Sequence, residues 1–147
     1  APMEKTMQEI KWKFGSPVSD EVVRAVESQL GVVFPSDYRT LVGQHNGGRP
    51  KPNAVEIPGR REAVLERLVR LDACGGDDVA SAAAVLRGRG QGNLVPFASD
   101  PFGNLFCFQF ARKAQSAVVF WEHETGSVSA ICKTFSDLLA LLRPPLR

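Results

Sequence analysis

The segment Leu105–Phe110 constrains the fold more strongly than any other part of the chain. Phenylalanines occupy every second position and mostly apolar residues stand between them, so both faces of an extended strand would be covered. The residues on one face would be Phe106, Phe108 and Phe110, and those on the other Leu105, Cys107 and Gln109. The sequence therefore predicts a central strand of a sheet, with other elements packed on both sides of it.

Extended segments flank this strand on both sides. Asn93–Phe97 precedes it across a turn at residues 99–104, whose Asp, Pro, Gly and Asn residues are typical of tight turns. After it, Ala117–Trp121 and Val128–Ile131 enclose the acidic turn Glu122–Gly126, which is the pattern of a β-hairpin. Consecutive strands joined by short turns predict a mainly antiparallel sheet.

Helical patterns precede and follow these strands. Ser19 provides an N-cap oxygen for a helix that continues to Leu30, and Gly31 can take the left-handed conformation that ends it. Apolar spacing and flanking residues predict three more helices: Pro35–His45, Val79–Leu86, which Asp77 or Asp78 would cap, and Ser136–Leu142. This order predicts one α+β domain, in which the sheet packs against two N-terminal helices, a middle helix and a C-terminal helix.

The region between the second and third helices is less clearly patterned. Gly47–Asn53 contains two glycines and two prolines, which predict a loop, and Ala54–Ile57 follows as a short strand. The apolar spacing in Glu62–Leu71 suits either a helix or one face of a strand. Periodicity leaves both assignments open.

Length and charge limit the classes of protein that need to be considered. A chain of 147 residues sustains one core without metals, and we expect a single domain at residues 17–147 after an N-terminal extension or tag remnant at residues 1–16. The net charge of +2, from 18 Lys and Arg against 16 Asp and Glu, gives no support for direct nucleic-acid binding. No apolar run is long enough for a membrane span, and the first residues lack the apolar core of a secretory signal. These features favour a cytoplasmic protein.

The cysteines and histidines do not form a recognisable reactive site. Cys74, Cys107 and Cys132 are odd in number, lack a Cys-x-x-Cys pair and have no histidine at zinc-ligand spacing, so we expect neither a disulfide framework nor a metal site. Cys107 and Cys132 lie in apolar stretches and are predicted to be buried packing residues. Gly88–Gly92 lacks the strand and helix context of a nucleotide-binding loop, so no cofactor is expected.

Catalysis would have to involve one of two histidines. His45 is predicted at the end of a helix, where a capping role is expected, and His123 stands between two glutamates in a turn. No nucleophile motif such as Gly-x-Ser-x-Gly is present. We therefore expect no catalytic residues, with a small-molecule-binding or hydrolytic protein that uses His45 or His123 in a pocket as the alternative.

The order of several short motifs resembles the SUKH superfamily, specifically its Smi/Knr branch, over about Pro17 to Leu142. The motifs that carry this resemblance are Val32–Tyr38, Asn46-Gly47-Gly48, Val95–Ala98, Asp100 with Gly103-Asn104, Val119–Glu124 and the final segment Phe135–Leu142. Many relatives have an acidic residue where this chain has Gln109, so the chain departs from the pattern there.

The resemblance implies a fold and a class of function. The fold would be a single α+β domain with a curved sheet, which favours a strand over a helix for Glu62–Leu71. The function would be non-enzymatic protein binding: many bacterial members are similar to immunity proteins that neutralise polymorphic or contact-dependent toxins, often nucleases, whereas fungal relatives regulate cell-wall synthesis. A cognate toxin domain is the expected partner, and a regulatory scaffold that binds an endogenous protein is the alternative.

Exposed acids and an aromatic anchor are the residue types that would recognise a basic partner protein. We expect Trp121, which ends a strand beside the acidic turn, to lie either in the core or at the surface as such an anchor. The candidate partner-binding residues are Asp77, Asp78, Asp100, Trp121, Glu122, His123 and Glu124.

Overall fold

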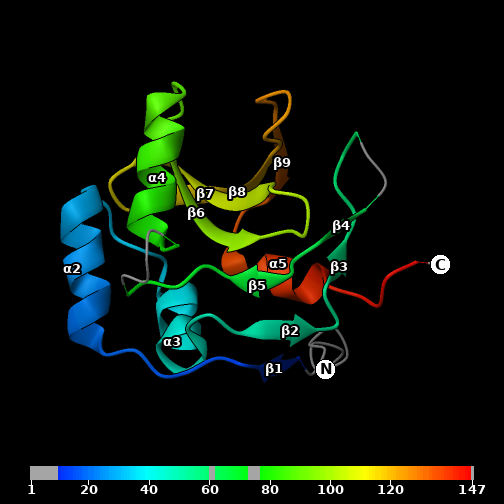
Figure 1. Ribbon diagram of the computed structural model, residues 1–147, viewed down its shortest axis with the longest axis horizontal. Coiled ribbons are helices and arrows are strands. Elements are labelled where there is room, and N and C mark those ends of the chain that lie inside the picture. The colour runs from blue at the N-terminus through cyan, green and yellow to red at the C-terminus, as the bar shows by residue number, and fades with distance from the viewer. Residues whose placement is uncertain (1–9, 60–61, 73–76, 147) are drawn as a thin grey trace.

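The computed structural model describes residues 10–59, 62–72 and 77–146 and has the predicted α+β architecture (Figure 1). A five-stranded sheet has the order β5-β6-β7-β8-β9, and each neighbouring pair is antiparallel. Its strands are β5 (Arg67–Leu68), β6 (Leu94–Ser99), β7 (Leu105–Arg112), β8 (Gln115–Trp121) and β9 (Val128–Cys132). The Phe-rich segment is therefore the central strand, as predicted.

The four predicted helices are present with nearly the expected bounds. They are α2 (Asp20–Leu30), α3 (Ser36–His45), α4 (Val79–Gly88) and α5 (Phe135–Leu141). The Ser19 hydroxyl accepts a hydrogen bond from the Val22 amide at 3.2 Å, and Gly31 ends α2 with a φ of 72°. Asp78, not Asp77, caps α4, because its carboxylate accepts from the Ser81 amide at 2.8 Å.

Two small ribbons complete the fold and correct two sequence expectations. β1 (Lys11–Lys13) pairs with β2 (Arg49–Lys51), so strands occupy part of the expected 1–16 extension and part of the expected Gly47–Asn53 loop. Pro50 lies opposite Trp12, and a two-stranded ribbon tolerates such a proline because one side of each strand needs no ladder bond. β3 (Ala54–Val55) pairs with β4 (Ala63–Val64), which with β5 confirms the strand assignment for Glu62–Leu71.

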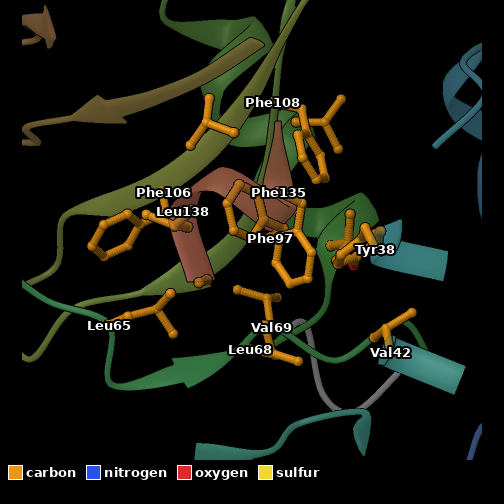
Figure 2. Packing of buried hydrophobic residues seen from close by; sticks show 14 of the residues in the cluster. Tyr38, Val42, Leu65, Leu68, Val69, Phe97, Phe106, Phe108, Phe135 and Leu138 are labelled. Atoms are coloured by element: carbon orange, nitrogen blue, oxygen red, sulfur yellow. The ribbon is translucent and has the colours of Figure 1, made fainter. Parts of the chain in front are cut away.

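The sheet is covered on both faces, which explains the apolar character of β7. On one face Phe106, Phe108 and Phe110 belong to the main core, to which α3 contributes Tyr38 and α5 contributes Phe135. Figure 2 shows the centre of this core, where the rings of Phe97 and Phe108 stack at 4.3 Å between centroids. On the other face Cys107 lies in a second cluster beneath α4. Figure 1 shows α4 on the opposite side of the sheet from α5.

The two cysteines in the described part of the chain differ in burial. Cys107 is fully buried, as predicted, and burial raises the pKa of its thiol far above its usual range. Cys132 is only half-buried; burial together with the nearby Asp137 charge raises its pKa to about 11. Both are packing residues in their thiol form at neutral pH. Cys74 lies outside the described residues. None of the described helices is long and apolar enough to cross a lipid bilayer.

Candidate protein-binding surface

The turn between β6 and β7 is fixed by a buried carboxylate. Asp100 is only 4% exposed, and one of its oxygens accepts from the backbone amides of Phe102 at 2.9 Å and Asn104 at 2.8 Å. Its other oxygen accepts from the Asn104 side-chain amide at 2.9 Å. An aspartate that accepts from amides two and four residues later specifies one turn conformation. Asp100 thus organises this turn from within and is not a surface acid.

Asn104 joins this turn to the turn between β8 and β9. Its side-chain oxygen accepts from the His123 backbone amide at 3.0 Å. Gly103, with a φ of 92°, lies against the His123 ring: a methyl group at this position would approach the ring carbon Cδ2 to 3.1 Å. The two turns therefore contact each other closely, and a side chain at residue 103 would strain the backbone at this positive φ and crowd the His123 ring.

The β8–β9 turn has its own set of internal hydrogen bonds. The Glu122 amide donates to the Ser127 carbonyl at 3.0 Å, and the Gly126 amide donates to the Glu122 carbonyl at 2.7 Å. The side chains of His123 and Glu124 are exposed, and that of Glu122 is partly exposed. We call the combined surface of residues 100–104 and 122–127 the turn junction.

Phe102 is a large apolar residue exposed to solvent at the turn junction. Its side chain is 73% exposed, although its backbone amide is held by Asp100. An aromatic side chain on a fixed turn presents apolar area without much freedom to lose on binding. Phe102 is not among the predicted partner-binding residues. The signal was an aromatic residue inside a turn of polar, Pro and Gly residues, where a core role is not available.

The seven predicted partner-binding residues do not lie on one surface. Glu122, His123 and Glu124 are at the turn junction, and Asp100 lies beneath it. Trp121 is 4% exposed and packs with Leu86 under α4, so the core expectation for it is correct and the anchor expectation is wrong. The Arg89 guanidinium lies over its ring at 5.7 Å.

The expectation of an exposed acid holds for Asp77 and is wrong for Asp78. Asp78 is 7% exposed and occupied as a helix cap, whereas Asp77 is exposed and paired with Arg67 at 2.9 Å. Figure 1 shows the first residues of α4 well separated from the turn between β8 and β9. The two acidic pairs therefore do not form a continuous patch.

The two histidines lie in different surroundings, His45 against an aromatic ring and His123 exposed in a turn. His45 lies in the last turn of α3, and its ring stacks on Trp12 at 5.7 Å between centroids. His123 is exposed and packs on Gly103. No group of three or more His, Cys, Asp or Glu side chains in residues 10–59, 62–72 and 77–146 could hold a metal ion.

A family model described as SMI1-KNR4 cell-wall (SUKH_6) matches residues 20–139, which include the five-stranded sheet, α2, α3, α4, most of α5 and the turn junction. The chain belongs to this family. SMI1-KNR4 proteins are generally non-enzymatic binding proteins. A shorter match joins the chain to the uncharacterized protein YnaB of Bacillus subtilis (strain 168), with 39% identity over 41 residues. That match spans 28% of each chain, so the two proteins are compared over only part of their length.

The Asn-Gly-Gly motif that contributed to the SMI1-KNR4 resemblance has a structural explanation. Asn46 is completely buried; its side-chain oxygen accepts from the Leu71 amide at 2.8 Å, and its side-chain amide donates to Asp72 at 2.8 Å. Its backbone exchanges two hydrogen bonds with Ser16. Arg70 holds Asp72 with two hydrogen bonds of 3.1 Å, and Gly47, with a φ of 78°, makes room for the Arg70 side chain. We call Asn46, Gly47, Arg70 and Asp72 the Asn46 cluster.

The charges within the Asn46 cluster stabilise one another. The hydrogen bonds from Arg70 and then from Asn46 hold the pKa of Asp72 below its usual range. The cluster ties the N-terminal segment, the end of α3 and the segment after β5 together in the interior. It is a folding element of the domain, with Asn46 completely buried and the Arg70 and Asp72 side chains partly exposed.

Proposed function

We propose that this protein is a non-enzymatic, cytoplasmic immunity protein that neutralises a cognate toxin domain by direct binding, with the turn junction as its contact surface. The observation that carries the proposal is the 73% exposed Phe102 on a turn held from below by buried Asp100. Membership of the SMI1-KNR4 family supports the class of function.

The residues of a protein interface contribute unequally to its affinity. A few aromatic or arginine side chains in a desolvated centre contribute most of the binding energy, and a polar rim excludes water around them. Phe102 has the properties of such a centre, and His123 and Glu124 supply a polar rim on the adjoining turn. A turn that already has its bound conformation pays little conformational entropy on association.

The charges at the rim favour a basic partner surface. Glu122 and Glu124 flank His123, and opposite charges across an interface raise the association rate and suppress wrong partners. A toxin that acts on nucleic acid has a basic surface where it binds the phosphate backbone, so an acidic rim around an aromatic anchor would suit that class of toxin. Inhibition then requires only that the site be covered.

The test is co-expression with the toxin domain encoded by the neighbouring reading frame. Wild-type protein should restore growth and form a complex with the purified toxin domain in calorimetry. Phe102→Ala should weaken the complex by about 2 kcal/mol and reduce protection. The matched control is Phe14→Ala, which removes a similarly exposed phenylalanine (80% exposed) directly after β1. This variant should leave both complex formation and protection unchanged.

Two results would contradict the proposal. A neighbouring toxin domain that is neither bound nor neutralised would remove the immunity role, and an endogenous protein recovered as a stoichiometric partner would replace it with a Smi/Knr-type scaffold. Equal losses in Phe102→Ala and Phe14→Ala would remove the turn junction from the interface.

A further inference from the structure

One edge of the five-stranded sheet is covered by another segment of the chain, and in the described residues the other edge has no strand beside it. At the β5 edge the Leu68 amide donates to the Gly48 carbonyl at 2.8 Å, so the β2 segment covers that edge. The opposite edge is β9, which follows β8 and has no further strand beside it in the described part of the chain. Its five residues, Val128–Cys132, range from half-buried to exposed.

The outer edge of β9 carries backbone N–H and C=O groups that do not pair with β8. In an antiparallel pair, every second residue directs its N–H and C=O away from the neighbouring strand. Within residues 10–59, 62–72 and 77–146, the backbone groups of Val128–Cys132 make no backbone–backbone hydrogen bond outside the pairing with β8. Monomeric proteins usually protect such an edge with charged residues or proline, and the sequence Val-Ser-Ala-Ile-Cys contains neither.

The ends of β9 carry opposite charges. The exposed Glu124 lies in the turn before β9, and the exposed Lys133 directly follows it. When two copies of this strand align antiparallel about a twofold axis, Lys133 of each copy lies next to the acidic turn of the other. A surface that is complementary to itself in this way fits the symmetric interface of a homodimer. The net charge of +2 opposes association only weakly.

We propose that β9 pairs antiparallel with β9 of a second copy of this chain, with the twofold axis near Ala130. The two sheets then continue into one another, and the unpaired groups of both edges become hydrogen-bonded. The regular part of the strand suffices for this, because the register shift between β8 and β9 lies beside Val118 and Val119, and Val128–Ala130 remain evenly paired. This inference does not depend on the toxin-binding role or on Phe102.

The first test is the mass of the full chain in solution. Light scattering after gel filtration, from micromolar to submillimolar concentration, should show a species of twice 16.0 kDa that gives way to monomer on dilution. Ala130→Lys places two like charges opposite each other at the axis and should raise the dimer dissociation constant at least about tenfold. Ala111→Lys, at an exposed alanine near the end of β7, is the matched control and should leave it unchanged.

Crosslinking and charge reversal test the arrangement itself. Under mild oxidation Ala130→Cys should form a disulfide-linked dimer rapidly, whereas Ala111→Cys and the wild type should not. Lys133→Glu should weaken the dimer, and Glu124→Lys in the same chain should restore it. A chain that stays monomeric throughout, a dimer that tolerates Ala130→Lys, or the absence of selective crosslinking or of rescue would overturn the proposal. A monomer whose Ala130→Lys variant loses binding to a protein partner would assign the edge to that partner instead.

Discussion

The Asn46 cluster and the turn junction contain the same pattern of hydrogen bonds, but they differ in what they expose to solvent. In each, a buried asparagine side chain accepts from a distant backbone amide: Asn46 from Leu71, and Asn104 from His123. In each, the same side chain donates to an aspartate, which is Asp72 in the first region and Asp100 in the second. The Asn46 cluster joins segments of the chain and exposes no aromatic side chain, whereas the turn junction leaves Phe102 mostly in solvent.

The difference shows how a binding surface is recognised in a protein without catalytic groups. A buried polar network that stabilises the interior can be explained by folding alone. The network at Asp100 likewise stabilises its own turn, but folding does not explain the aromatic side chain above it, because the chain gains nothing in stability from leaving Phe102 in water. The two regions should therefore respond differently to substitution.

The largest effect is expected in the interior. Asn46→Ala would leave the Leu71 amide buried without a partner and would remove a hydrogen bond from Asp72, so we expect a loss of about 3 kcal/mol in the free energy of unfolding. Urea denaturation followed by tryptophan fluorescence measures it. The control is Asn93→Ala, at an exposed position, for which we expect a change within about 0.5 kcal/mol. A small effect at Asn46 would mean that water replaces its hydrogen bonds.

A smaller and more local loss is expected at the turn. Asp100→Ala removes the acceptor of three hydrogen bonds, and we expect a cost of about 2 kcal/mol, since the end of a sheet relaxes more easily than its interior. Hydrogen exchange should accelerate at residues 102–104 and 123, while the amides of α2 remain protected. Uniform acceleration throughout the chain would place Asp100 in the same folding unit as the Asn46 cluster.

The pH dependence of the free energy of unfolding measures how much the Asp72 charge contributes to the Asn46 cluster. Because the pKa of Asp72 is lowered in the folded state, its contribution is present above the unfolded value of about 3.9 and is lost as the pH falls through the lower folded value. Asp72→Asn should therefore be less stable than wild type at neutral pH, by less than about 1 kcal/mol because the side chain is partly exposed. The difference should shrink in acid denaturation experiments below about pH 4. A constant difference would assign the effect to shape rather than charge.

The sequence predicted the elements of the fold better than the contacts between them. Periodicity and caps located the four helices, and the alternation in Leu105–Phe110 located the central strand, because these signals are local. β1 and β2 were missed because each becomes a strand only by pairing with a segment more than thirty residues away, and Pro50 indicated a loop.

The candidate site was predicted in part for the same reason. Glu122, His123 and Glu124 are adjacent in sequence, and their exposure follows from the turn. The role of Asp100 depends on its position beneath Asn104, and the burial of Trp121 depends on α4, neither of which is local. Phe102 was overlooked because an aromatic residue is expected in the core, and only the turn geometry shows that it has no core to enter.

The smallest effect on the free energy of unfolding is expected at Phe102. This measurement tests whether the turn junction, unlike the Asn46 cluster, has a side chain that does not contribute to folding. Phe102→Ala removes a ring that is mostly in water and leaves the backbone amide that Asp100 holds, so the free energy of unfolding should change by less than about 0.5 kcal/mol. The same denaturation measurement checks this, and unchanged hydrogen exchange at residues 100–104 would show that the turn is intact. A loss above about 1 kcal/mol would mean that the ring packs on the turn junction and contributes to folding. With stability unchanged, any weakening of a toxin complex by Phe102→Ala reports a lost contact, whereas weakening by Asp100→Ala combines that contact with the disorder of the turn.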